Sequence, residues 1–332
     1  MKKKYISSID EFKLIDMIKN DFTKLNLKND NNIIVNIGDD CFCFKIGQKK
    51  IFITKDMLIE NVHFKKNWID PQDLGKKAVE VNISDIAAMG NVKPKYIFIG
   101  LGIPPTTSKI FIKKLYKGLK MTCDKYNMVI AGGDTVRADK IIISITTIGI
   151  GKTNKIIRRN NARVGDLIGL TNTFGDAGAG VDLLYKYGPK HKYNKYERFL
   201  ISKQNNPKAK FNESIMISKH LTSLIDASDG FYVSVNLLAK NSNKGADIYI
   251  EKIPISLSLK KVIKNKSEQI KYALFGAEDY ELIFTVSTLK AKLIKEILPS
   301  ISYVGRINLS KKVKYFYNGK EKKVKYSGYR HF

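Results

Sequence analysis

One aspartate on the apolar face of a predicted helix constrains this chain more than any other feature of its sequence. Asp70 is a good N-cap, Pro71 suits the first helical position and Gly90 is a natural stop, so we predict a helix between Asp70 and Gly90. At about 100° per residue, Asp85 lies about 20° from Leu74, on the apolar stripe that faces the interior. A carboxylate in that position is costly unless it is paired or binds a metal. Asp85 alone would suggest a capped backbone turn.

Further acids change that interpretation, because they also follow predicted strands or lie in glycine-rich turns where a ligand can approach closely. Together with Asp85 they are Asp39, Asp40, Asp56, Asp134, Asp226 and Asp229. Two carboxylates about 4 Å apart repel by roughly 4 kcal/mol at an effective dielectric of 20, so converging acids need protons or cations. Mg²⁺ prefers hard oxygen ligands and bridges carboxylates to phosphate oxygens. The set therefore predicts one pocket that holds Mg²⁺ ions and a polyphosphate.

The chain is long enough for two domains, since its 332 residues exceed one small core. In the first half we expect a sheet with helices mostly on one face. Its strands are predicted at 33–37, 41–46, from 51, 96–103, 128–131 and 141–150, its helices at 8–19, 70–90 and 108–126, and a turn at 132–135. Residue 8 with residue 11 forms a capping box for the first helix.

Residues 151–161 are interpreted as the interdomain linker. In the second half we expect strands at 166–171, 224–226, 246–250 and after 282, with helices opening at 175, near 196, at 209–220 and after 230. The lysine-rich tail at 311–325 contains Asn318 and Gly319, a hairpin turn signal.

The net charge of +28 raises the alternative of an RNA-binding protein. However, the lysines are spread along the chain without an arginine-rich block, so nucleic acid is the weaker interpretation. No run of about 18 apolar residues predicts a membrane span. The three cysteines, Cys41, Cys43 and Cys123, match no zinc spacing and imply no disulfide framework, which favours a reducing cytoplasm.

Short motifs in the same order across nearly the whole chain resemble the thiamine-monophosphate kinase family. They are GDD at 38–40, TKD at 54–56 followed by His63, NISDIAAMG at 82–90, GGDT at 132–135, Arg159 ahead of 165–166, GD at 175–176, DASDG at 226–230, EDYEL at 278–282 and GYRHF at 328–332. The runs at 82–90 and 278–282 favour this family over the purine-biosynthesis synthetases that share its superfamily.

The resemblance implies ATP-dependent transfer of a phosphoryl group to thiamine monophosphate, giving thiamine diphosphate, on a mixed α/β (α+β) fold. That fold is the two-domain architecture of the aminoimidazole-ribonucleotide synthetase superfamily, usually dimeric through the N-terminal sheets. Residues 1–150 would bind Mg²⁺ and ATP and form the dimer, and residues 151–332 would complete the nucleotide and substrate site. The chain would be a homodimeric kinase with several Mg²⁺ ions as cofactors and ATP as co-substrate.

The resemblance also assigns residues by position. Mg²⁺ ligands would be Asp39, Thr54, Asp56, Asp85, Asp134, Asp226 and Asp229. ATP would contact Gly133, Asp134, Arg159 and Ser228, and thiamine monophosphate would contact His63, Glu278 and Tyr329. No general base is needed, because the attacking phosphate oxygen is already ionised. For His63 the alternative is a histidine that only satisfies its own loop.

Three positions depart from the family pattern. Lys55 stands where the family usually has a metal-binding Thr or Ser, Ala277 replaces Gly, and Arg330 replaces Asp. We hypothesise that the Lys55 ammonium substitutes for part of one metal's charge; the alternative is a lysine that points to the surface. The other functions left open are a purine-biosynthesis synthetase of the same superfamily, an RNA-binding protein and a catalytically silent scaffold.

Overall fold

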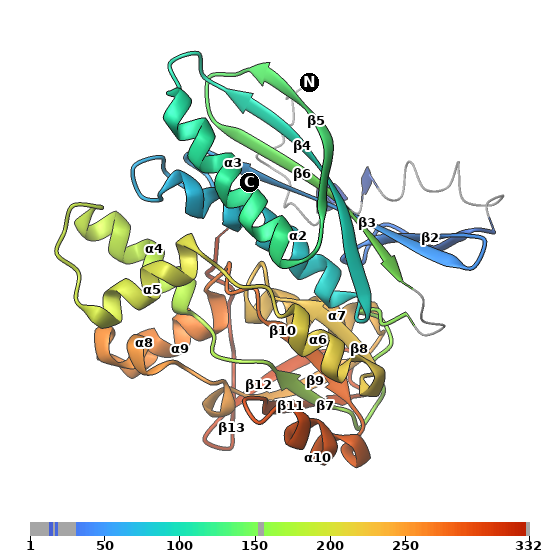
Figure 1. Ribbon diagram of the computed structural model, residues 1–332. Helices are drawn as coiled ribbons and strands as arrows, with labels where there is room; N and C mark the ends of the chain where they lie inside the picture. Colours follow the sequence, from blue (N-terminus) through green and yellow to red (C-terminus); the bar gives the residue numbers. More distant parts are fainter. Residues whose placement is uncertain (1–12, 16, 19–30, 152–155, 330–332) are drawn as a thin grey trace, which may run out of the picture.

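A computed structural model describes residues 13–15, 17–18, 31–151 and 156–329, and it places two sheets in separate layers (Figure 1). The predicted capping box at residues 8 and 11 and the changed residue Arg330 lie outside the described residues. Among the described residues, none of the helices combines the length and apolar character that a membrane crossing requires.

The first sheet has six strands in the order β1-β2-β3-β6-β4-β5. They are β1 Ile33–Val35, β2 Phe42–Ile46, β3 Lys49–Ile59, β4 Val92–Ile103, β5 Val129–Arg137 and β6 Ile142–Gly151. In β6, buried Ile143 and Ile145 alternate with the less buried Ser144 and Thr146, as expected for a sheet covered on one face. Helices α2 (Pro71–Ala88) and α3 (Lys109–Lys125) cover that face, which confirms the predicted arrangement.

Local signals set the ends of α2 where they were predicted. The Asp70 carboxylate accepts a hydrogen bond from the backbone N–H of Gln72 at 2.8 Å, Pro71 opens the helix, and Gly90 follows it at φ 84°. Unlike an ordinary amphipathic helix, α2 also packs against β8 and α6 of the second layer. Polar side chains such as Lys77 and Ser84 are therefore buried on it.

The predicted turn at 132–135 is wrong, because β5 continues through it to Arg137 in parallel register with β4. The register skips Ala131, so a β-bulge occurs where the turn was expected. A Cβ on Gly133 would lie 1.9 Å from the carbonyl oxygen of Ile99. These glycines therefore permit close strand pairing and do not reverse the chain.

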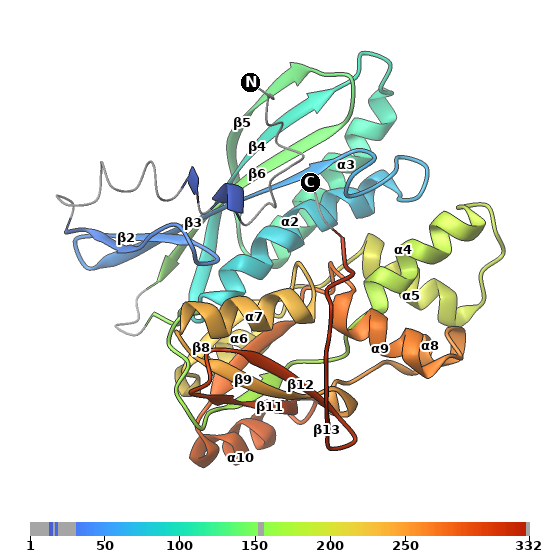
Figure 2. The ribbon, with the colours of Figure 1, turned by 180° about the vertical axis from the view of Figure 1, so that it is seen from behind.

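The second sheet has seven strands in the order β13-β12-β9-β11-β7-β10-β8. They are β7 Leu167–Leu170, β8 Ser223–Asp226, β9 Gly245–Tyr249, β10 Leu282–Val286, β11 Ser302–Asn308, β12 Val313–Tyr317 and β13 Lys320–Lys322. The β12–β13 pair is the predicted hairpin, with Asn318 at φ 50° and Gly319 at φ 76°. After β13 the chain runs back toward α2 (Figure 2).

Helices cover both faces of the second sheet. The helical elements of this half are α4 Asp176–Tyr187, α5 Lys195–Asn205, α6 Phe211–Ile217, η2 Ser218–His220, α7 Phe231–Asn241, η3 Ile250–Lys252, α8 Leu257–Val262, α9 Lys266–Phe275 and α10 Thr288–Ile297. Of these, α4, α5 and α8 pack against one another in a hydrophobic cluster of their own. One hydrophobic cluster joins the sheet to α7 and α9, and another joins its opposite face to α6, α10 and the end of α2. The end of α2 thus packs into a hydrophobic cluster of the second layer. The residues around Asp85 therefore lie between the two layers.

Candidate active site

Three aspartates from different elements converge where α2 meets the second sheet. Asp40 precedes β2, Asp85 lies in the last turns of α2 and Asp226 ends β8, and one carboxylate oxygen of each lies within 4.8 Å of the others. Ser84 donates to Asp226 Oδ2 at 2.8 Å, and Thr54 on β3 donates to Asp85 Oδ2. We call Asp40, Asp85 and Asp226 the acidic cluster.

Two more acids border the acidic cluster. Asp56 follows Thr54 by two residues on β3, so both side chains lie on the same face of the strand. Burial, and next the charges of Asp226 and Asp229, raise the pKa of Asp56 to about 7. Asp229 follows β8 in the turn that opens α7. The acids at these five positions therefore share one electrostatic environment.

Arg159 is the cation that faces these acids. Its guanidinium donates to Asp40 Oδ1 through Nη2, and its Nε lies 3.5 Å from Asp39 Oδ1. The backbone N–H of Arg159 also donates to Asp39 Oδ2 at 3.4 Å. Despite this pairing, burial raises the pKa of Asp39 and raises that of Asp40 well above its usual range. One guanidinium does not balance the converging carboxylates.

The acidic cluster fits a hard divalent cation. Burial raises the pKa of Asp85 and of Asp226, and the neighbouring acids add to the shift of Asp85. In the part of the chain that the structure describes, the buried Oδ2 of Asp40 has no hydrogen-bond partner. Carboxylate oxygens with one unsatisfied buried acceptor match the ligand preference of Mg²⁺. A cation here would relieve the repulsion that otherwise favours protonation.

A cavity of about 740 Å³ opens beside the acidic cluster and reaches from β3 to Tyr329. Asp56, Ser228 and Asp229 line it, and so do the three residues predicted to contact the second substrate, His63, Glu278 and Tyr329. His63 lies in the loop after β3, and its Nδ1 accepts a hydrogen bond from the backbone N–H of Ile59 at 3.1 Å. The proton of a neutral His63 ring therefore lies on Nε2.

The loop that carries Glu278 is held in an unusual conformation. Glu278 has φ 63° and Tyr280 has φ 49°, values in the left-handed region that are uncommon without glycine. The backbone N–H of Glu278 donates to the carbonyl of Ser228 at 2.6 Å, and Asp279 accepts hydrogen bonds from the backbone of Gly175 at 2.6 Å and Ala177 at 3.1 Å.

The acids of the EDYEL motif therefore have different roles. Glu281 is buried and bound by Thr171 at 2.6 Å and Lys210 at 3.2 Å. Asp279 is also buried, where it fixes the start of α4, whereas Glu278 lines the cavity. Two of the three acids thus build the loop, and one faces the ligand space.

Two predicted site residues lie outside this arrangement. Gly133 and Asp134 are exposed on β5, the edge strand, and β6 and β4 separate β5 from β3. The Asp134 carboxylate accepts from the backbone N–H of Thr135 at 2.8 Å. Within one copy of the chain, neither residue reaches the acidic cluster.

The charge-substitution hypothesis for Lys55 is wrong. Side chains alternate along β3, so Lys55 points away from Thr54 and Asp56 onto the open face of the first sheet. There its exposed ammonium lies 3.4 Å from the hydroxyl of Thr146. Lys55 is the surface lysine of the alternative interpretation.

The sequence prediction missed part of the site. The family resemblance gives Asp40 no ligand role, although Asp40, and not Asp39, belongs to the acidic cluster. Ser84 and Lys77 were not singled out, because polar residues on a helix are ordinarily solvent-exposed. The available signal for Ser84 was its position directly before Asp85 in the 82–90 motif.

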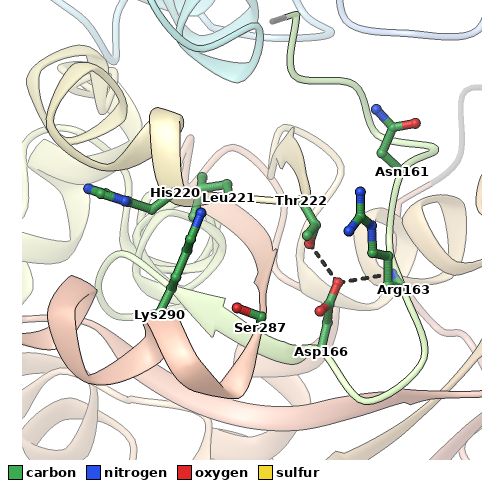
Figure 3. Close-up of a pocket in the computed structure, with 8 residues that line it drawn as sticks. All are labelled: Asn161, Arg163, Asp166, His220, Leu221, Thr222, Ser287 and Lys290. Carbon is green, nitrogen blue, oxygen red and sulfur yellow. Dashed lines mark hydrogen bonds between the residues drawn. The ribbon is translucent and has the colours of Figure 1, made fainter.

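A second cavity, of about 490 Å³, lies elsewhere in the C-terminal half (Figure 3). It is lined by Asn161, Arg163, Asp166, His220, Leu221, Thr222, Ser287 and Lys290. Asp166 is already bound by the backbone N–H of Arg163 at 2.9 Å and by Thr222 at 2.6 Å. Because this cavity contains no predicted site residue, the first cavity is the candidate active site.

The sequence and the fold of this chain are similar to those of known proteins. Residues 38–151 match the family described as AIR synthase related protein, N-terminal domain. The whole chain is similar to the thiamine-monophosphate kinase of Aquifex aeolicus (strain VF5), with 33% identity over 98% of this chain and 99% of the relative. It is 37% identical to that of Buchnera aphidicola subsp. Acyrthosiphon pisum (strain APS), over 97% of this chain and 98% of the relative.

The fold is similar to that of a solved structure, AaThiL complexed with AMPPCP and TMP. The TM-score is 0.87, the sequence identity is 33%, and the alignment covers 100% of both chains. The predicted architecture, a mixed α/β fold like that of aminoimidazole-ribonucleotide synthetase, is confirmed.

Proposed function

Because this chain belongs to the thiamine-monophosphate kinase family, we propose that it transfers the terminal phosphoryl group of ATP to thiamine monophosphate, with Mg²⁺ held by its acidic cluster. The products are thiamine diphosphate and ADP. The observation that carries the proposal is the convergence of Asp40, Asp85 and Asp226 beside a cavity that also contains His63, Glu278 and Tyr329.

Charge neutralisation is the main task of such a site, because an anionic phosphate must attack an anionic triphosphate. Mg²⁺, when bound, would supply the positive charge that neutralises phosphate oxygens. Asp40, Asp85 and Asp226 are its proposed central ligands, and Asp39, Asp56 and Asp229 lie around them. Thr54 and Ser84 fix the direction of two of these carboxylates by donating hydrogen bonds.

The chain's other residues would orient the two substrates. Arg159 supplies a cation beside Asp39 and Asp40, where a nucleotide phosphate would approach, and Ser228 lies between the cluster and the cavity. His63, Glu278 and Tyr329 would contact thiamine monophosphate. None of them needs to remove a proton, since the attacking oxygen carries its charge at neutral pH.

A homodimer through the first sheet is part of the proposal. The face of that sheet opposite α2 and α3 exposes large apolar side chains, including Met57 (44%), Phe98 (42%) and Val136 (55%). Asp134 lies exposed on β5 of the same sheet. We propose that Gly133 and Asp134 reach a nucleotide site only in the dimer, from the second copy.

A reducing compartment, the cytoplasm, also belongs to the proposal. Cys41, Cys43 and Cys123 are free and buried in the structure. Burial raises the pKa of Cys43 to about 11 and that of Cys123 to about 12, so neither thiol is readily ionised. This supports cysteines that act as small apolar core residues.

One assay tests the function. Purified protein is incubated with MgATP and thiamine monophosphate, and the products are separated by chromatography. We expect thiamine diphosphate and ADP in a one-to-one ratio. ADP formation that requires a purine precursor would instead support a purine-biosynthesis synthetase. Salt-sensitive RNA binding without turnover would support the RNA-binding alternative, and absence of nucleotide binding would support a silent scaffold.

A further inference from the structure

Lys77 is a fully buried cation that the proposed reaction does not use. It lies in the middle of α2, and only 1% of its side chain is exposed. Its Nζ donates to Glu278 Oε2 at 3.0 Å, to the carbonyl oxygen of Gln204 at 3.0 Å and to that of His63 at 3.4 Å. An ammonium has three N–H donors, so these three acceptors satisfy it completely.

The three acceptors come from separate parts of the fold. His63 belongs to the loop after β3 in the first layer, whereas Gln204 and Glu278 belong to the second. Gln204 lies in the last turn of α5, where carbonyl groups lack a helical partner and carry partial negative charge. Lys77 therefore joins both layers at the wall of the cavity.

Two of these acceptors belong to residues that line the cavity, His63 and Glu278. Lys77 binds the backbone carbonyl of His63 and the side-chain carboxylate of Glu278. The other support for Glu278 is its backbone bond to Ser228, which does not direct the side chain. Within the described chain, the ion pair with Lys77 is the contact that orients the Glu278 carboxylate.

The electrostatic surroundings make that orientation necessary. Burial raises the pKa of Tyr280 well above its ordinary value, and the charges of Glu278, Asp56, Asp226 and Asp85 add to the shift. Glu278 thus lies in the same negative field as the acidic cluster. Without a cation on its own side, Glu278 would compete for the metal ions or turn away from the cavity.

We infer that Lys77 is a positioning residue: it holds Glu278 and the His63 loop in the geometry that binds the phosphate-acceptor substrate. The inference rests on the proposed function, because it deepens the role of the same cavity. The inference predicts that loss of Lys77 weakens binding of thiamine monophosphate and leaves ATP binding unchanged. The reason is that Lys77 contacts His63, Gln204 and Glu278, and not the residues proposed to bind ATP. A merely structural role would lower stability without separating the two substrates.

The test compares four variants in steady-state assays: Lys77→Met, Glu278→Gln, the double variant, and Lys76→Met as the matched control. Lys76 is the neighbouring residue on α2, and its ion pair with Asp73 is partly exposed. We expect Lys77→Met to raise the KM for thiamine monophosphate about tenfold or more and to change the KM for ATP less than about twofold. Lys76→Met should match the wild type in both.

The double variant shows whether Lys77 acts through Glu278. If it does, the two effects are not additive, and the double variant is no worse than Lys77→Met alone. The double variant also removes both members of the buried ion pair, so it keeps the test valid if Lys77→Met fails to fold. Additive losses, or an unchanged acceptor KM in a folded Lys77 variant, would overturn the inference. Absence of turnover in the wild type would instead overturn the proposed function.

Discussion

Ser84 in α2 donates a hydrogen bond of 2.8 Å to Asp226 at the end of β8, 142 positions further along the chain. The next residue, Asp85, accepts a hydrogen bond from Thr54 on β3. Two consecutive residues of one helix thus connect the acidic cluster to both layers. The relative position of the layers and the geometry of the proposed metal ligands therefore depend on the same contacts.

Replacing Asp226 by asparagine should abolish most turnover while preserving the fold. The asparagine side chain keeps the shape of the aspartate and one oxygen for the Ser84 hydroxyl, but the substitution removes a charge that would hold Mg²⁺. We expect kcat to fall by about 10²-fold or more. Steady-state rates at saturating MgATP measure this, with Asp73→Asn on the surface of α2 as the control. A variant with wild-type kcat would exclude Asp226 as a ligand.

Asp56 should make the metal-free protein less stable as the pH rises. Its pKa is raised to about 7 in the fold, from an ordinary value of 3.8, so the folded state keeps a proton that the unfolded chain has lost. The resulting stabilisation is complete below about pH 4 and is lost as the pH rises to about 7, with a slope of at most about 1.4 kcal/mol per pH unit.

Denaturant unfolding in EDTA, at pH 5 and pH 8, measures this dependence. The free energy of unfolding of Asp56→Asn, minus that of the wild type, should be larger at pH 8 than at pH 5. The asparagine amide does not titrate, so the variant lacks the loss of stability that Asp56 causes in the wild type as the pH rises. Equal pH dependence in both proteins would show that Asp56 does not titrate in this range.

Lys55→Thr should leave the Mg²⁺ dependence of turnover unchanged. Lys55 lies on the opposite face of β3 from the acidic cluster, so its ammonium cannot replace a metal's charge there. The half-saturating Mg²⁺ concentration, measured at fixed ATP, should agree with the wild type within about twofold. A clearly higher Mg²⁺ requirement in the variant would mean that Lys55 does face the metals.

Mixed dimers should reveal whether Asp134 acts from the second copy. Asp85→Asn and Asp134→Asn should each be inactive alone. If the two residues belong to different subunits of one site, a mixed dimer contains one intact site. Random mixing then restores about a quarter of wild-type activity, since half of the dimers are mixed and each has one of two sites. No recovery after denaturation and co-refolding would place both residues in the same subunit or exclude the dimer.

Local signals were enough to predict the elements whose ends depend on them. The Asp70 cap and Gly90 fix α2, and the Asn318–Gly319 turn fixes the β12–β13 hairpin, because these residues act within a few positions of themselves. The inward direction of Asp85 followed from helical periodicity alone. The overall architecture depended on the resemblance to a known family.

Two features that the sequence does not predict depend on contacts with distant parts of the chain, whereas a third had a local signal. Gly132 and Gly133 are typical of a turn, but their conformation is set by pairing with β4, more than thirty residues earlier. Lys77 is buried because α2 lies between two layers, which no pattern within the helix reveals. Lys55 was misassigned from its place in a motif, although strand alternation predicts its opposite direction.

The central claim is that the acidic cluster binds a divalent cation, and direct binding of Mn²⁺ tests it without reference to activity. Electron paramagnetic resonance follows the loss of free Mn²⁺ signal on titration with protein, and added Mg²⁺ should release the bound ion. We expect saturable binding by the wild type that is weakened about tenfold or more in Asp40→Asn and in Asp85→Asn. Equal Mn²⁺ affinity in the wild type and in both variants would contradict the claim.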